Sequence, residues 1–385
     1  MPGISKLFKS LIASNQVQVT NNTASSVIIK SDSSMVDVII IGAGLTGLTL
    51  ANLLIQDGRS VVVLEARDRV GGRIHTHKTS DGAEVEMGAT WYFPHFSNLW
   101  KHMKSVNMDL MEQYMKGYTL QEGSVGSEPR RFYEGGSSDM FRIKGGTGNL
   151  TKTLLKKIGE DKVVLNQVVT DIKSVDDGME VVTKDSSYRA ARVVTTIPPQ
   201  LLAHSVTFNP ALPNEVKQIT STTHTWMGNS MKGAITYAKP FWKEKGLSGA
   251  LYSYAGPFVQ MYDQTSTDGK HFALVGFMNE KIASLPYEER KKKVVSQLVR
   301  VFGDEARNPI DYKDTFWAEE EFTMPANDQR LSAHRNNGHS IYRKPHMGGR
   351  LYIAGTETSS QAGGYMEGAI NSANFVHKQL KSDFK

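Results

Sequence analysis

The feature that most constrains the fold is an apolar run that leads directly into a glycine-rich turn. Residues 36–41 are almost all apolar and rich in β-branched side chains, which is typical of a buried parallel strand. Residues 42–47 then read Gly-x-Gly-x-x-Gly, and apolar residues at helical spacing over 48–54 predict a helix. A second buried strand over residues 60–64 ends at Glu65. This order predicts a strand–helix–strand unit that begins a parallel sheet.

The turn has the spacing of a dinucleotide-binding loop. Its first glycine permits a tight turn, the second lets the backbone approach a pyrophosphate, and the third lets the helix pack against the strand. The phosphates would lie at the helix N-terminus, where unpaired N–H groups favour anions. The acidic residue at the end of the next strand would accept hydrogen bonds from the ribose hydroxyls. The candidate residues of this loop are Gly42, Gly44, Leu45, Thr46, Gly47 and Glu65.

NAD and FAD both use such a unit, and the residues that follow it favour FAD. Residues 65–73 read Glu-Ala-Arg-Asp-Arg-Val-Gly-Gly-Arg. This segment resembles the second glycine motif of the glutathione-reductase-type flavoproteins. The resemblance implies that its arginines and glycine backbone face the flavin diphosphate. It adds Ala66, Arg67, Gly72 and Arg73 to the candidate cofactor site.

A third motif lies near the C-terminus. Residues 351–358, Leu-Tyr-Ile-Ala-Gly-Thr-Glu-Thr, and 364–369, Gly-Tyr-Met-Glu-Gly-Ala, are similar to the flavin-end motif of the monoamine oxidase family. We expect a helix whose N-terminus points at the flavin pyrimidine ring, where its dipole stabilises the reduced anion. Glu357 would hold ribityl hydroxyls, and the Met366 N–H would bind the N1/C2=O edge. The candidates here are Gly355, Thr356, Glu357, Gly364, Tyr365 and Met366.

The resemblance extends through the middle of the chain and covers about residues 36–380. Residues 230–237 look like the family strand that carries a lysine near flavin N5, which implies that Lys232 holds a water there and assists the oxygen step. The alternation of side chains along the strand, taken alone, predicts that Lys232 faces solvent. Tyr365 would orient the substrate nitrogen over the flavin. Further implied cofactor contacts are Gly88, Ala89, Thr90, Trp91, Val169 and Trp317, although a lone Trp is more often core.

Some positions depart from the family pattern. The chain has no cysteine, and Ala326 stands where family members with covalent flavin carry one, so FAD must be bound non-covalently. Asn327 stands where a second tyrosine of the aromatic cage is usual, which leaves Tyr365 alone. The segment 110–146 is shorter than in long family members, which suggests a smaller or more open cavity. We assign Trp91, Phe93 and Asn327 to the substrate pocket. The aromatic cluster 92–96 suits an apolar or aryl amine, or equally a core.

The fold class that follows is α/β. We expect a two-domain flavoprotein, with a Rossmann-like FAD-binding domain and a smaller α+β substrate domain on a mixed sheet. The FAD-binding domain would comprise residues 35–110, 144–220 and 327–385, and the substrate domain residues 111–143 and 221–326. Among the expected elements are strands over 162–170, 178–183, 192–197, 231–237, 271–278 and 350–354, and helices over 287–302 and 365–380.

The predicted function is FAD-dependent amine oxidation. A hydride would pass from the carbon next to the amine nitrogen to flavin N5 and leave an imine, which hydrolyses. Reoxidation of the reduced flavin by oxygen would give hydrogen peroxide. Two alternatives stay open. One is a flavin dehydrogenase or desaturase of the same fold that acts on a non-amine substrate, and the other is a non-catalytic flavin-binding interaction protein.

Composition bounds the partners and the location. The net charge of +6 is dispersed, so we expect no nucleic-acid partner. The partners that the family resemblance implies are a small-molecule amine and oxygen. The eleven histidines show no metal-ligand spacing. No apolar run is long enough to span a membrane. We expect a cytoplasmic location, with a homodimer left open. Residues 1–34 read as a disordered leader, and helically spaced apolar residues near its start leave targeting or membrane-surface attachment open.

Overall fold

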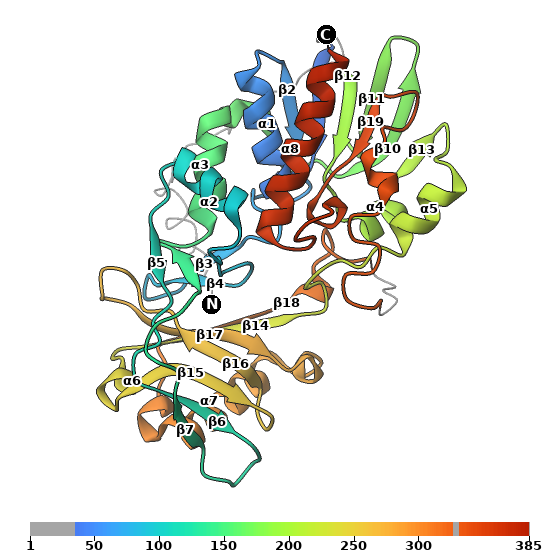
Figure 1. Cartoon of the computed structure of the whole chain (residues 1–385). Coiled ribbons are helices and arrows are strands. Elements are labelled where there is room, and N and C mark those ends of the chain that lie inside the picture. Colours follow the sequence, from blue (N-terminus) through green and yellow to red (C-terminus); the bar gives the residue numbers. More distant parts are fainter. Residues whose placement is uncertain (1–34, 326–330, 385) are drawn as a thin grey trace, which may run out of the picture. The chain divides into compact units, whose positions relative to one another are not determined.

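The structure is a computed structural model that describes residues 35–325 and 331–384, all within one compact unit. In the described residues two large sheets are the main frame, one built around the N-terminal strand and the other from the middle of the chain. Figure 1 shows the first sheet with its covering helices above the second. The expected α/β fold with an additional mixed sheet is therefore confirmed.

The first sheet has eight strands and combines parallel and antiparallel pairs. Its central pairs, β12–β1 and β1–β2, are parallel, as expected of a strand–helix–strand unit. All four residues of β2 and the last four of β1 are buried. In spatial order the strands are β13 (Thr207–Asn209), β10 (Val169–Val175), β11 (Gly178–Thr183), β12 (Ser187–Thr195), β1 (Val36–Ile41), β2 (Val61–Leu64) and β9 (Val163–Val164), and β19 (Leu351–Ile353) pairs with β12.

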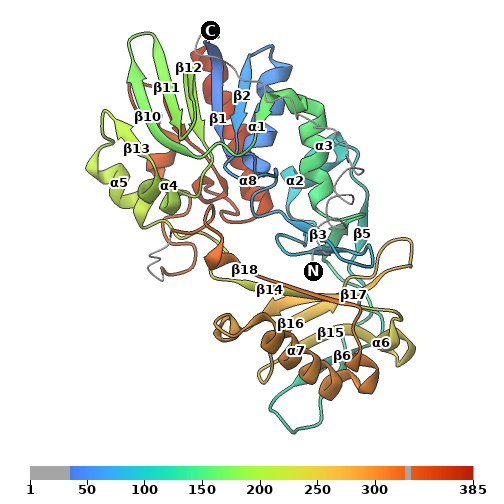
Figure 2. The same cartoon turned by 180° about the vertical axis from the view of Figure 1, so that it is seen from behind.

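Helices cover one face of this sheet. The glycine-rich turn leads into α1 (Leu45–Gln56), which packs beside the C-terminal helix α8 (Met366–Asp383). The two helices run side by side in Figure 1. Figure 2 shows the molecule from behind, where the strands of the sheet lie in front of these helices. α3 (Gly148–Ile158) packs on α1, and α2 (Ser97–Ser105) packs on α8. The turn and the C-terminal motif are thus held at neighbouring helix N-termini.

The second sheet has seven strands and is antiparallel except where β15 meets β6 and the pairing is parallel. All seven residues of β14 are buried, so both faces of this strand are covered. The long helix α7 (Tyr287–Phe302) packs its apolar side against this sheet. In spatial order the strands are β18 (Asp311–Phe316), β14 (Met231–Tyr237), β17 (Phe272–Met278), β16 (Phe258–Asp263), β15 (Leu247–Ser253), β6 (Tyr118–Glu122) and β7 (Arg130–Tyr133).

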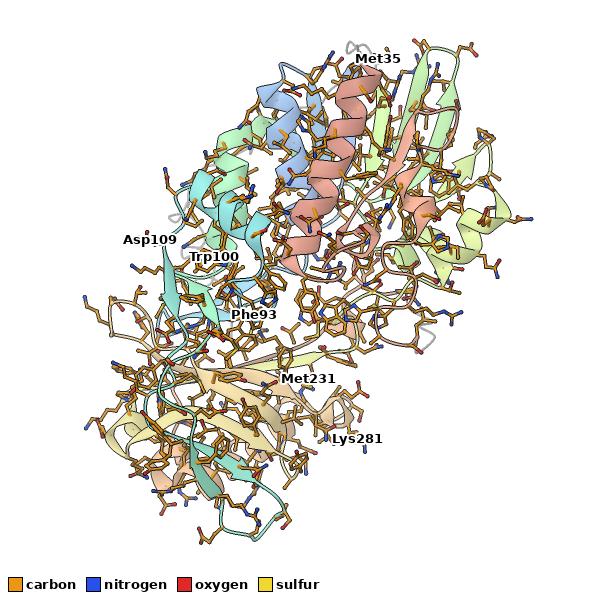
Figure 3. The ribbon with its side chains drawn as sticks, viewed as in Figure 1. Met35, Phe93, Trp100, Asp109, Met231 and Lys281 are labelled. Atoms are coloured by element: carbon orange, nitrogen blue, oxygen red, sulfur yellow. The ribbon has the colours of Figure 1, made fainter. Side chains whose placement is uncertain are left out.

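Short elements connect the sheets. The hairpin of β3 with β4 and the antiparallel pair of β5 with β8 lie in the connections, and Figure 3 marks Phe93 on the side of the helical layer that faces Met231 of β14. No helix of the described residues is long and apolar enough to cross a membrane. The remaining elements are β3 (Thr76–Lys78), β4 (Glu84–Glu86), β5 (Leu110–Glu112), β8 (Phe141–Ile143), α4 (Pro199–Ser205), α5 (Asn214–Ser221) and α6 (Phe241–Glu244).

One expected strand is corrected. Residues 162–170 do not form a single strand, because the chain makes β9 over two residues, leaves the sheet, and enters β10 at Val169 on the other side. Asn166, between them, has a positive φ of 58° and interrupts the extended backbone. The strands of the first sheet all come from the segments predicted for FAD binding, and those of the second from the predicted substrate segments. The domain boundaries themselves stay a prediction, and residues 1–34 lie outside the described residues.

The packing of α7 on the second sheet gives a stability prediction. Leu298 is fully buried between the helix and the sheet. Leu298→Ala leaves a cavity and should lower the free energy of unfolding by about 2–5 kcal/mol, measured by urea denaturation. Ser296→Ala, an exposed site on the same helix, is the matched control and should change stability by no more than about 0.5 kcal/mol. Equal losses in the two variants would contradict this packing.

Candidate functional site

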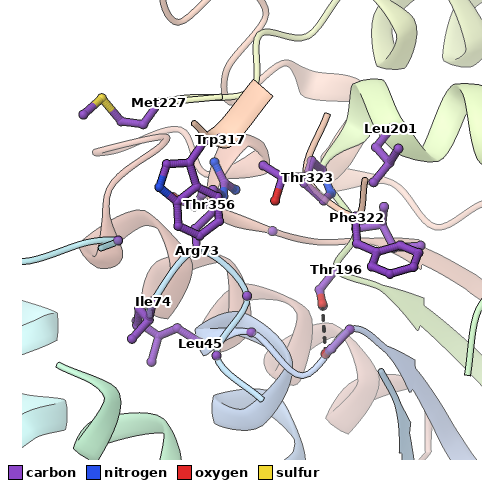
Figure 4. A pocket seen from close by; sticks show the side chains of 18 of the residues that line it. Leu45, Arg73, Ile74, Thr196, Leu201, Met227, Trp317, Phe322, Thr323 and Thr356 are labelled. Atoms are coloured by element: carbon purple, nitrogen blue, oxygen red, sulfur yellow. Dashed lines mark hydrogen bonds between the residues drawn. The ribbon is translucent and has the colours of Figure 1, made fainter. Parts of the chain in front are cut away.

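A cavity of about 1080 Å³ lies beside the glycine-rich turn and is lined from both ends of the chain. Figure 4 shows Leu45, Arg73, Trp317 and Thr356 around it. The structure gathers most of the predicted site residues on this one cavity. Those that line it are Gly42, Gly44, Leu45, Thr46, Glu65, Ala66, Arg67, Gly72, Arg73, Gly88, Ala89, Thr90, Trp91, Phe93, Val169, Lys232, Trp317, Gly355, Thr356, Gly364, Tyr365 and Met366.

The dinucleotide end of the cavity is preorganised by Glu65. Its carboxylate is buried and accepts hydrogen bonds from the N–H of Ala43, at 2.7 Å, and of Arg67, at 3.0 Å. Each oxygen keeps a further lone pair for a ligand hydroxyl. Gly47 does not line the cavity. A Cβ at this position would lie 2.0 Å from the Gly42 carbonyl oxygen, so the turn approaches the helix too closely for any side chain. The third glycine therefore serves the packing of helix against turn.

The same end fits a pyrophosphate. A Cβ built on Gly44 would meet no protein atom closer than 3.9 Å, so the space beside this residue is open. Gly44 precedes α1, whose first-turn N–H groups have no acceptor within the helix. A volume of about 1080 Å³ also suits a large ligand, because pockets for small molecules commonly have about 300–1,000 Å³. The residues present therefore fit FAD, with Glu65 and Met366 both lining the cavity.

A buried ion pair stands where a cofactor contact was expected. Arg73 binds both carboxylate oxygens of Glu357, at 2.6 and 2.9 Å, and Glu357 is fully buried. The Arg73 guanidinium also donates to the carbonyl oxygen of Trp226 at 2.9 Å, and the Trp226 N–H donates to Glu357 at 3.2 Å. Glu357 has these partners and does not line the cavity, so its contact with ribityl hydroxyls stays a prediction.

Lys232 is a buried cation at the cavity. Its Nζ donates to the Gly88 carbonyl oxygen at 2.8 Å and to the Thr90 hydroxyl at 2.6 Å. It also lies 5.1 Å from the ring centre of Trp91 and 5.4 Å from that of Phe277, close enough for cation–π attraction. The side chain is 2% exposed, so it is not the solvent-facing lysine that the alternation of the strand suggests.

A buried carboxylate balances this charge. Glu86 at the end of β4 accepts hydrogen bonds from the Thr76 hydroxyl and from the N–H of Thr147, the residue that caps α3. Burial lowers the pKa of the Lys232 ammonium to about 8, and the negative charge of Glu86 opposes that shift. Burial likewise raises the pKa of the Glu86 carboxyl to about 7, against the hydrogen bond from Thr147. Lys232 is therefore mostly protonated below about pH 8.

Aromatic rings surround the rest of the cavity. Tyr365 is the N-cap residue of α8, and its ring lies 5.7 Å from Phe96 and 5.6 Å from Trp226. Phe93, assigned to the substrate pocket, lines the cavity beside Phe96, with 5.6 Å between the ring centres. Trp317 is 3% exposed and donates its indole N–H to the Met87 carbonyl oxygen, so it both fills core and lines the cavity.

Two predicted positions lie outside the described part of the chain, and two residues at the cavity were not predicted from the sequence. Ala326 and Asn327 lie outside the described residues, so the structure does not place the predicted cage position. Sequence reasoning did not assign Trp226 or Phe277 to the site, because neither belongs to a recognisable motif. Phe277 lies directly across from Lys232 in the β14–β17 register, and such pairing cannot be read before the fold is known. Among the described residues, no cluster of three or more His, Asp or Glu could hold a metal.

Comparison with known proteins shows the family to which the chain belongs. The sequence model of the family described as flavin containing amine oxidoreductase matches residues 45–125 and 124–376. The flavin-containing amine oxidase of Danio rerio is 26% identical over 456 aligned positions, which cover 89% of this chain and 85% of that protein. Flavin-containing amine oxidase A of Canis lupus familiaris is also 26% identical, with 90% and 85% covered.

Solved structures show the same fold. Wild-type putrescine oxidase bound to putrescine superposes with a TM-score of 0.79 at 22% identity, covering 91% of this chain and 99% of that one. Cyclohexylamine oxidase from Brevibacterium oxydans gives the same score and identity, with 91% and 100% covered. Because the family match spans most of the sequence, this chain belongs to the flavin-containing amine oxidoreductase family.

Proposed function

We propose that this chain is an oxidase of small amines that passes electrons to oxygen. The observation that carries the proposal is Lys232, a buried cation held among aromatic rings at the cavity that fits FAD. Membership in the family supports amine oxidation with FAD. The buried charge supports oxygen as the acceptor, because positive charge stabilises the anion that oxygen becomes when it accepts an electron.

The cofactor would be held by residues from both ends of the chain. Glu65 would bind the ribose, the turn around Gly44 the pyrophosphate, and the N-terminus of α8 at Met366 the pyrimidine edge. Bound FAD supplies the hydride acceptor and the route for electrons to oxygen. The chain has no cysteine for a thioether link, in keeping with non-covalent binding.

The protein's own groups prepare the amine. An amine releases a hydride only when its nitrogen lone pair is free, while alkylammonium ions dominate in neutral water. The aromatic rings of Phe93, Phe96 and Tyr365 give the cavity a weakly polar wall that disfavours the charged form. The ammonium of Lys232 nearby adds like-charge repulsion in the same direction. Tyr365 would orient the nitrogen of the neutral amine.

Gly44 offers a direct test of the cofactor site. Gly44→Ala should fold, because its φ of −75° suits alanine and no protein atom lies closer than 3.9 Å to the new Cβ. The methyl group would occupy the space proposed for the pyrophosphate, so the purified variant should retain far less FAD by visible absorbance. Gly123→Ala, an exposed site with open space around its Cβ, is the control. Full FAD content in both variants would place the pyrophosphate elsewhere.

Lys232 gives a test of the oxygen step. Lys232→Met should slow reoxidation by about a hundredfold and flavin reduction by much less, as stopped-flow absorbance would measure. The exposed Lys239→Met, just beyond the same strand, should change neither rate. If the charge of Lys232 has no part in the oxygen step, the Lys232 and Lys239 variants will reoxidise at the same rate.

The pKa of Lys232 adds a pH dependence. The pKa is lowered to about 8, so the cation is present below that pH and lost above it. Wild-type reoxidation should therefore slow as the pH rises through about 8, while the rate for Lys232→Met stays flat over that range. A falling limb that persists in the variant would assign the titration to another group.

Oxygen consumption with an amine panel tests the function itself. Monoamines, polyamines and amino acids are offered to the FAD-loaded protein, and peroxide is measured alongside oxygen. Equal oxygen uptake and peroxide release with an amine supports the proposal. Flavin bleaching without oxygen uptake would favour a dehydrogenase, and no response to any compound would favour a flavin-binding interaction protein. Cytoplasmic location and homodimer formation stay predictions from the sequence.

A further inference from the structure

Trp226 lies at the cavity although no sequence motif marks it. It belongs to the loop between α5 and β14, is half-buried, and lines the cavity. Its ring centre lies 5.6 Å from that of Tyr365, with 43° between the ring planes. Trp226 is thus the neighbour of the tyrosine that the family resemblance places against the substrate nitrogen.

The position of Trp226 is fixed by its backbone. Its carbonyl oxygen accepts from Arg73 and its N–H donates to Glu357, so the buried ion pair holds both polar groups of the residue. On the side-chain side, a Cβ on Gly364 would lie 2.6 Å from the Cβ of Trp226. Only glycine at position 364, where φ is +92°, allows Trp226 to approach this closely.

The rings form one continuous wall. Successive ring centres are 5.6 Å apart from Phe93 to Phe96, 5.7 Å from Phe96 to Tyr365, and 5.6 Å from Tyr365 to Trp226. These are contact distances for aromatic pairs, so no substrate fits between neighbouring rings. His334 stacks on the Trp226 ring, with 4.0 Å between centres and 24° between planes, and adds support. A substrate would therefore lie along the wall.

We propose that Trp226 is the second aromatic contact of the substrate amine and acts with Tyr365 as a specificity-determining residue. The inference rests on the proposed amine oxidation at this cavity. The sequence has Asn327 where the family resemblance implies the second cage tyrosine, whereas Trp226 supplies a ring from another part of the chain. The four wall residues carry no carboxylate that could pair with a second ammonium, and the carboxylates that line the cavity, Glu65, Glu319 and Glu321, come from other segments. The substrate class that this wall favours is a monoamine with an aryl or bulky apolar group.

The test uses an amine that binds without reacting. The probe, 2-phenylpropan-2-amine, has no hydrogen on the carbon next to nitrogen, so it cannot be oxidised there. Its dissociation constant for the FAD-loaded protein is measured by isothermal titration calorimetry. Trp226→Leu, which keeps an apolar side chain but loses the ring, should bind about tenfold more weakly than the wild type. Trp226→Phe should restore most of the affinity.

Controls separate a binding role from a structural one. FAD content and thermal unfolding of the two variants should match the wild type, because the clamp on Trp226 uses backbone groups. Tyr254→Ala, an exposed aromatic residue that does not line the cavity, should bind the probe like the wild type. Equal affinities for the wild type and Trp226→Leu would overturn the inference. Failure of the wild type to consume oxygen with any amine of the panel would instead overturn the proposed function.

Discussion

The ion pair between Arg73 and Glu357 is the interaction on which the site depends. It joins the second glycine motif, the C-terminal motif and the loop before β14, three segments far apart in the sequence. The pair is bidentate and Glu357 is fully buried, so removing Arg73 would leave a buried carboxylate without its counterion, a loss of about 3–5 kcal/mol. With the pair intact, Trp226 is held beside Tyr365 and Arg73 stays at the cavity wall.

A second buried charge joins the two sheets. Lys232 on β14 reaches the carbonyl of Gly88 and the hydroxyl of Thr90, which precede the helical layer of the first sheet. Its counter-charge, Glu86, also accepts a hydrogen bond from the N–H of Thr147, the N-cap residue of α3, so the charge at the cavity is connected to the placement of that helix. The proposed chemistry uses this arrangement: a desolvated cation favours neutral amine and electron transfer to oxygen, and aromatic rings supply the remaining wall.

Local motifs made the fold predictable, and with it the gathering of the glycine-motif residues on one cavity. The bounds of β1, β14 and α7 agree with those predicted, because each is a continuous apolar or amphipathic run. Lys232 shows the limit of such patterns, since strand alternation predicts exposure and both faces of β14 are buried. Trp226 shows another limit. It lies in a loop without a motif, and only the folded chain brings Arg73, Glu357 and Gly364 around it.

The measurement that tests the central claim most directly is anaerobic titration of the FAD-loaded protein with benzylamine, followed by the visible absorbance of oxidised flavin. Without oxygen, hydride transfer from the amine to flavin is isolated from reoxidation. The account predicts that the absorbance bleaches with benzylamine and stays unchanged with benzyl alcohol, which has the same ring but no amine. Bleaching by the alcohol alone, or none by benzylamine or other amines, would contradict amine oxidation at this site.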